Sequence, residues 1–147
     1  MSNLTLLIPA KFESESLPIF LDELKDYNYK KLVVLDQSDT KTIDSIRNFN
    51  NVEILHQKKT GYGNALIEGI NYITTDLFCI INADGSMNPS ELRGMLNEID
   101  DNNRDIVFGS RYMQNAGSDD DDLVTSIGNF IFTSIGKVFF RDFNIFF

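Results

Sequence analysis

The sequence predicts an α/β domain with a mostly parallel β-sheet and helices on both faces of that sheet. Short apolar runs alternate with segments whose apolar residues recur every three or four positions, which is typical of strands alternating with amphipathic helices. Residues 31–35 also lack the apolar–polar alternation of a strand with one solvated face, as expected where helices cover both faces. Strands and helices in this alternating order favour parallel pairing through right-handed crossovers.

The first half of the chain supplies three of the expected strands. Residues 4–8 are apolar apart from one threonine and are followed by a helical pattern at Leu17, Phe20, Leu21 and Leu24. Residues 31–35 are rich in Val and Leu and form the second expected strand. A short helix over 42–49 and a third strand over 52–55 follow.

The second half continues the alternation with two more strands. A helix over 64–73 is entered through Gly61-Tyr62-Gly63, and residues 77–81 form the fourth strand. Pro89 suits the first position of the next helix, where no backbone donor is needed. The apolar face of that helix is Leu92, Met95, Leu96 and Ile99, and the fifth expected strand covers 105–108.

Composition excludes several classes of function. The chain has 147 residues, enough for one ordinary domain, and carries a net charge of -9 that repels nucleic-acid backbones. Its single cysteine, Cys79, excludes an internal disulfide framework, and its single histidine, His56, excludes a paired-histidine zinc site. No nucleic-acid partner is therefore expected.

The ends of the chain suggest a cytoplasmic protein that could touch a membrane. Its first residues lack the basic start of a signal peptide, so the cytoplasm is the expected compartment. Residues 123–140 are apolar with Lys137 as their only charge, but they are rich in Ser, Thr, Asn and Gly. We expect an apolar helix over 123–141 that packs on protein, joins two copies, or lies on a membrane surface rather than spanning it.

Polar residues follow the expected strands at the edge where open parallel sheets bind ligands. Glu13 follows the first strand, Asp36 the second and Asp84 the fourth, while Arg111 follows the fifth. Gathered carboxylates repel one another unless a cation or hydrogen-bond donors lie among them. The pattern favours a magnesium– or manganese–diphosphate site at Asp84, with Glu13 and Asp36 free to bind a nucleoside. On spacing alone, Asp84-Gly85-Ser86 is equally well explained as a simple turn.

Five segments in order give the chain a family resemblance. Residues 4–140 resemble family 2 glycosyltransferases of the GT-A fold, and among them the polyprenyl- or dolichyl-phosphate sugar transferases. The segments that carry the resemblance are Leu7–Leu17 (LIPAKFESESL), Val33–Asp39 (VVLDQSD), Lys59–Gly69 (KTGYGNALIEG), Asn82–Pro89 (NADGSMNP) and Asp105–Tyr112 (DIVFGSRY).

The resemblance implies a nucleotide-diphospho-sugar donor, a Mg²⁺ or Mn²⁺ cofactor, and a polyprenyl phosphate acceptor at the cytoplasmic membrane face. It implies one GT-A-like domain over 1–147, with the nucleotide-sugar-binding part at 1–112 and a shortened acceptor half. Asp84 and Ser86 would face the metal, and Asp84 and Arg111 would act at the transferring group. The residues implied around the nucleotide sugar are Pro9, Lys11, Glu13, Val34, Asp36, Asn82, Ala83 and Asp84.

Departures from the family pattern, above all at Asn82 and after the last helix, keep a second interpretation open. Phe12 stands where the family usually has Asn, Leu35 replaces one acid of a pair, and Asn82 replaces the first acid of the metal motif. The Asp…Ser-Gly-Phe-Arg segment that follows the last helix in the family has no counterpart before Phe147. The alternative is a catalytically incomplete nucleotide-sugar-binding remnant or a subunit of a split enzyme. A phospho-acceptor receiver domain is excluded, since Pro9-Ala10-Lys11 stands where it needs an acidic pair.

Overall fold

The computed structural model describes residues 3–102 and 104–109. The chain divides into two compact units, Met1–Asn97 and Glu98–Phe147. Within the described residues, all four strands belong to the first unit. The described part of the second unit contains the end of one helix and an irregular segment.

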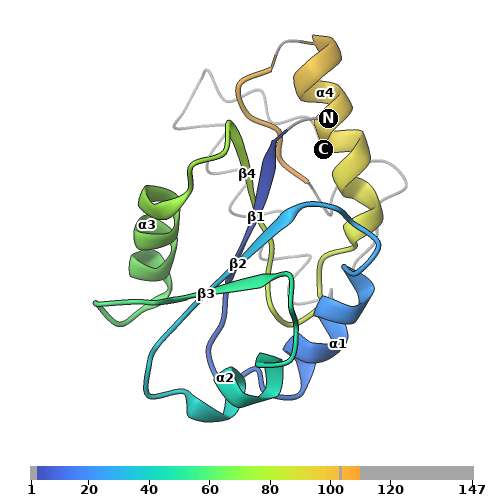
Figure 1. Ribbon diagram of the computed structural model, residues 1–147. Coiled ribbons are helices and arrows are strands. Elements are labelled where there is room, and N and C mark those ends of the chain that lie inside the picture. The colour runs from blue at the N-terminus through green and yellow to red at the C-terminus, as the bar shows by residue number, and fades with distance from the viewer. Residues whose placement is uncertain (1–2, 103, 110–147) are drawn as a thin grey trace, which may run out of the picture. The chain divides into compact units, whose positions relative to one another are not determined.

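The first unit is built on a four-stranded parallel sheet. Its strands are β1 (Leu4–Pro9), β2 (Lys30–Leu35), β3 (Val52–His56) and β4 (Leu77–Ile80). Their spatial order is β3-β2-β1-β4, so β1 and β2 are central (Figure 1). The parallel sheet predicted from the apolar runs is confirmed, and its first four strands lie at the predicted places.

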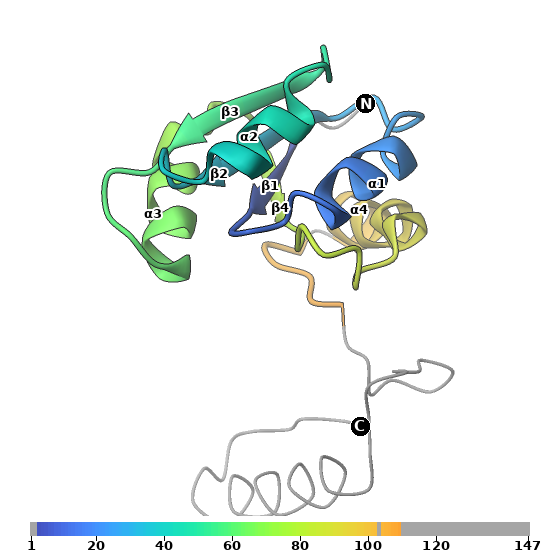
Figure 2. The ribbon, with the colours of Figure 1, turned by 90° about the horizontal axis from the view of Figure 1, so that it is seen from below.

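Helices cover both faces of this sheet, also as predicted. They are α1 (Ser16–Glu23), α2 (Thr40–Ile46), α3 (Tyr62–Tyr72) and α4 (Leu92–Asn102), the last preceded by a 3₁₀ turn at Pro89–Glu91. Helices α1 and α2 lie side by side in two views of the chain (Figures 1 and 2). Helix α3 lies on the other side of the strands from α1 (Figure 1).

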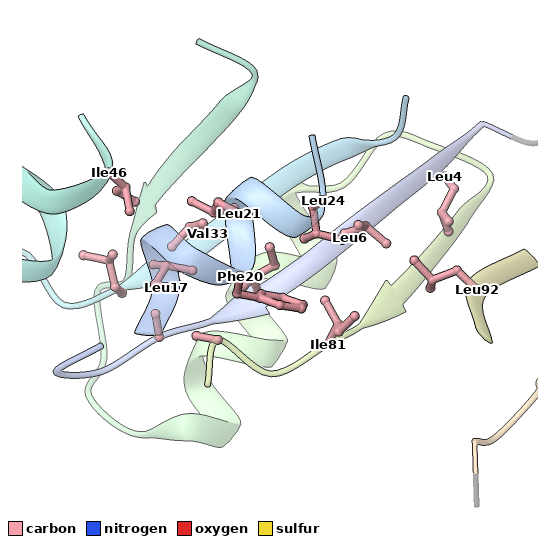
Figure 3. Close-up of a cluster of buried hydrophobic side chains, with 14 residues drawn as sticks. Leu4, Leu6, Leu17, Phe20, Leu21, Leu24, Val33, Ile46, Ile81 and Leu92 are labelled. Carbon is pink, nitrogen blue, oxygen red and sulfur yellow. The ribbon is translucent and has the colours of Figure 1, made fainter. Parts of the chain in front are cut away.

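Alternate residues of the central strand enter two separate cores. Leu4, Leu6 and Ile8 of β1 pack with the apolar side chains of α1 on one face. Figure 3 shows Leu17, Phe20 and Leu21 of α1, and Leu24 just after it, gathered with Leu6 and Val33. The predicted helical stripe is therefore the buried face of α1, because its period matches one side of a helix.

The core on the opposite face of the sheet has fewer buried residues, and the packing of α3 there involves a glycine. Leu7, Leu32 and Val34 pack there against Ala65 of α3. A Cβ atom added at Gly69 of α3 would lie 2.3 Å from Leu7 Cδ1 and 3.1 Å from Val34 Cγ2. A side chain at position 69 would force the buried Leu7 side chain to move, so glycine favours the close approach of α3 to the sheet.

The fifth predicted strand is wrong. Residues 105–108 form no strand, and Ile106 and Phe108 are 68% and 83% exposed. An apolar run becomes a strand only where it finds a pairing partner, which local composition does not reveal. The helix predicted over 42–49 instead runs from Thr40 to Ile46, because Asp39 caps its start.

Other predictions concern the part of the chain outside the described residues. The apolar helix expected over 123–141 lies there, as does residue 112, where the nucleotide-sugar-binding part was expected to end. Among the helices of residues 3–102, none is long and apolar enough to cross a membrane.

Candidate active site

A cleft of about 320 Å³ opens where the carboxyl ends of the four strands meet. Every strand contributes to its wall, either by its last residue or by the loop that follows. This is the edge at which the sequence predicted a site. The lining residues are Pro9, Ala10, Lys11, Glu13, Asp36, Gln57, Thr60, Gly61, Tyr62, Ala65, Asn82, Ala83 and Asp84.

The loop after β1 is held by side chains at the start of α2. Phe12 has a left-handed backbone with φ 61°, and its N–H donates to Asp39 Oδ2 at 2.7 Å. The N–H of Glu13 donates to Thr42 Oγ1 at 3.0 Å, and the Ser16 hydroxyl donates to the Glu13 carboxylate. Asp39 and Thr42 are both buried, so their hydrogen bonds to the backbone of residues 12 and 13 fix the position of Glu13 in the cleft.

Asp36 follows β2 in a tight turn that favours its ionised form. Its Oδ1 accepts hydrogen bonds from the Ser38 N–H at 2.9 Å and the Ser38 hydroxyl at 2.7 Å. These bonds lower the pKa of Asp36, and the nearby charge of Lys11 adds a smaller effect in the same direction. At neutral pH, Asp36 presents a carboxylate to the cleft.

The loop after β4 is built in a similar way. The Ser86 N–H donates to Asp84 Oδ1 at 3.0 Å across Gly85, whose φ is 75°. This bond is the main reason that the pKa of Asp84 is lowered. Asp84 can therefore both form a turn and line the cleft. The turn holds one of its carboxylate oxygens in a hydrogen bond, while the residue lines the cleft.

The segment after β3 forms a wall that sequence reasoning largely missed. Gln57, Thr60, Tyr62 and Ala65 all line the cleft. The sequence pattern singles out Gly61 and Gly63 but not the exposed side chain of Tyr62 between them. The Gly-Tyr-Gly order carried a usable signal, since an aromatic residue that opens a helix at the binding edge of a sheet is placed to meet a ligand.

Most of the predicted nucleotide-sugar residues are brought together. Pro9, Lys11, Glu13, Asp36, Asn82, Ala83 and Asp84 all line the one cleft. Val34 does not line it, because its side chain is buried between β2 and α3. Ser86 is exposed and contacts Asp84 through its backbone, but it too is absent from the lining. Arg111 lies outside the described residues.

The carboxylates do not form a ready-made metal cage. Within residues 3–102 and 104–109, no three His, Cys, Asp or Glu side chains gather closely enough to hold a metal ion. Cys79 lies in β4, and burial raises the pKa of its thiol, which suits a small apolar role.

Comparison with known proteins decides the family. The family model described as Glycosyl transferase family 2 matches residues 5–147. The chain belongs to this family. The four-stranded parallel sheet with helices on both faces is consistent with a single GT-A domain, and the family predicted from the five segments is confirmed.

Similar proteins carry related names. Uncharacterized glycosyltransferases of Mycobacterium bovis and Mycobacterium tuberculosis are each 32% identical over 107 residues, which cover 73% of this chain and 48% of theirs. A dolichol-phosphate mannosyltransferase of Pyrococcus furiosus is 29% identical over 118 residues, covering 75% of this chain and 33% of that protein. The chain thus spans about half or less of the length of the curated relatives it matches.

Proposed function

We propose that this chain takes part in transferring a sugar from a nucleotide-diphospho-sugar to a polyprenyl phosphate acceptor, and that the transfer requires a divalent metal ion. The observation that carries the proposal is that Glu13, Asp36 and Asp84 line one cleft although they follow three different strands. Family membership supports sugar transfer in general, and the chemistry of the cleft supports the choice of donor.

The cleft residues fit a nucleotide donor. Ionised Asp36 and the anchored Glu13 are hydrogen-bond acceptors suited to ribose hydroxyls or a base edge. Asn82 offers both a donor and an acceptor beside them.

The residues also fit a metal ion that arrives with its substrate. Mg²⁺ usually binds one or two carboxylates and completes its shell with water and substrate phosphates. Asp84, kept ionised by its turn, is the residue that would hold it. When bound, the metal would stabilise the negative charge on the departing diphosphate. Lys11 brings a positive charge to the same cleft.

The proposed acceptor is suggested by the mannosyltransferase relative, whose name includes dolichol phosphate. A phosphate oxygen is already a nucleophile, so the protein need not supply a strong base and has mainly to orient the two substrates. Arg111 is proposed to face the diphosphate or the acceptor phosphate. Such an acceptor would place the reaction at the cytoplasmic face of a membrane, with the apolar 123–141 segment as the contact.

One observation favours a second candidate, a chain that binds the nucleotide sugar without transferring the sugar. Asn82 lines the cleft where the family motif has an acid, so the metal would meet one carboxylate fewer. That substitution would weaken metal binding while leaving the nucleotide contacts in place.

Calorimetric titration distinguishes these functions. UDP-, GDP- and dTDP-sugars are titrated with Mn²⁺ and with chelator, using the full chain, Asp84→Ala, and Asp76→Ala as a matched control. Asp76 is an exposed aspartate that precedes β4 and so lies at the opposite edge of the sheet. Metal-dependent binding lost only in Asp84→Ala supports the proposal, and binding unchanged by chelator contradicts its metal dependence.

Transfer is then tested with a polyprenyl phosphate and a radiolabelled donor. Label that enters the lipid fraction supports the transferase. Metal-dependent donor binding without transfer favours the binding-only alternative.

A further inference from the structure

We propose that the segment from Gln57 to Tyr62, held in place by Glu68, is the end of the cleft that recognises the nucleobase, with the Tyr62 ring as its stacking surface. This inference rests on the proposed nucleotide-sugar donor. It adds a specificity-determining residue, Tyr62, and a positioning residue, Glu68.

The order of strands in the sheet gives an order along the ligand. The cleft edge runs from β3 through β2 and β1 to β4. Neighbouring strands are about 4.8 Å apart, so each strand end contacts a different part of an extended ligand. A diphosphate at Asp84 after β4 puts the ribose near Glu13 and Asp36, after β1 and β2. The base is then directed to the remaining end, which is the segment after β3.

The chemistry of that end suits a flat aromatic ligand. Tyr62 lines the cleft while 58% of its surface is exposed, so its ring is available for contact. Gly61, with φ 106°, makes the turn that starts α3 at Tyr62, and the Ala65 N–H donates to the Gly61 carbonyl at 3.0 Å. The ring therefore projects from the rigid first turn of a helix. Aromatic side chains that stack on bases contribute about 1–3 kcal/mol for each base, or about 5- to 150-fold in affinity.

Glu68 fixes this wall from outside the cleft. Its two carboxylate oxygens accept hydrogen bonds from the N–H groups of Lys58 and Lys59, at 2.7 and 2.9 Å. The Gln57 side chain donates to the Lys59 carbonyl at 2.8 Å, and the Asn64 side chain donates to the Thr60 carbonyl at 2.8 Å. One carboxylate on the second turn of α3 thus ties the segment to the helix that carries Tyr62.

The Tyr62 test separates base contacts from phosphate contacts. UDP, GDP and dTDP are titrated into the full chain with Mg²⁺, and inorganic pyrophosphate is measured by competition with the tightest of them. We expect Tyr62→Ala to lower the affinity for the nucleoside diphosphate by about 5- to 150-fold and to leave the affinity for pyrophosphate unchanged. We expect Tyr62→Phe to bind both ligands like the wild type. Unchanged nucleotide affinity in Tyr62→Ala, or an equal loss for pyrophosphate, overturns the inference.

Glu68→Gln tests whether Glu68 positions the segment from Gln57 to Tyr62, and Glu53→Gln is its matched control. Glu53 also accepts a side-chain hydrogen bond on the surface, from Tyr72, but it lies outside the cleft lining. We expect Glu68→Gln, and not Glu53→Gln, to reduce nucleoside diphosphate affinity while leaving pyrophosphate affinity unchanged. A Glu68→Gln variant that binds both ligands like the wild type removes the positioning role. A wild-type chain that binds none of the three nucleotides contradicts the proposed function itself, before any variant is compared.

Discussion

The carboxylate of Asp39 accepts a hydrogen bond from the backbone N–H of Phe12, at 2.7 Å and across 27 residues of sequence. The same carboxylate caps α2 by accepting from the Thr42 N–H at 3.3 Å. One buried side chain therefore starts a helix and also holds the loop that presents Glu13. Phe12 is 77% exposed and keeps its left-handed backbone because this bond secures it.

Residue 12 should prefer a side chain that tolerates positive φ. We expect Phe12→Asn to be more stable than Phe12→Ala by about 1 kcal/mol, because Asn adopts the left-handed region more readily than Ala. Both variants lose the contact between Lys11 and the ring, so that loss cancels in the comparison. Urea denaturation of the two variants measures the difference, and equal stabilities would contradict a strained backbone at this position.

Removing the Asp39 carboxylate should destabilise the domain more than removing an exposed acid. Asp39→Ala loses a helix cap and leaves the Phe12 N–H without its partner, which should lower the free energy of unfolding by about 1–3 kcal/mol. Asp44→Ala is the control, because Asp44 forms an exposed ion pair with Arg47 worth about 0–1 kcal/mol. Similar losses in the two variants would show that Asp39 does not hold the loop.

The close approach of α3 to the sheet predicts opposite effects at two glycines. Gly69→Ala would place its Cβ 2.3 Å from Leu7 Cδ1, and such overpacking should destabilise the domain by about 1–3 kcal/mol. Gly94→Ala on α4 meets nothing within 4 Å and should stabilise by about 0.5–1 kcal/mol through helix propensity. Thermal unfolding of both variants tests this, and a Gly69→Ala variant as stable as the wild type would refute the packing.

The bonds made by Glu68 predict a pH dependence of stability. The two backbone donors lower the pKa of Glu68 below its ordinary value of 4.5, so the ionised form stabilises the folded chain. This stabilisation is fully present above pH 4.5 and is lost as the pH falls through the lowered value. Glu68→Gln should therefore have a lower Tm than the wild type at neutral pH, and the gap should close on acidification. A gap that is independent of pH would mean that the carboxylate charge contributes nothing.

Patterns carried by neighbouring residues could be predicted from the sequence. The apolar run of β1 predicted a central strand, and the apolar stripe of α1 predicted the helix that packs on it. Burial imposes both patterns directly on neighbouring residues. Glu13, Asp36 and Asp84 were placed in one cleft because parallel strands end at a common edge.

Features that depend on distant partners could not be predicted. The left-handed conformation of Phe12 depends on Asp39, and the wall at Tyr62 depends on Glu68, so neither shows in the local sequence. Residues 105–108 have the composition of a strand but form none, since pairing is decided outside the segment.

We propose that a metal-bound nucleoside diphosphate lies across the ends of the four strands with its phosphates at Asp84. Backbone amide NMR spectra recorded with Mg²⁺ and the nucleoside diphosphate, and then with traces of paramagnetic Mn²⁺, test it most directly. We predict the strongest broadening at residues 82–86 and metal-independent shifts at residues 11–13, 36 and 57–62. Broadening confined to exposed acids such as Asp100 and Asp101, with unshifted signals at the ends of β1, β2 and β3, would contradict the account.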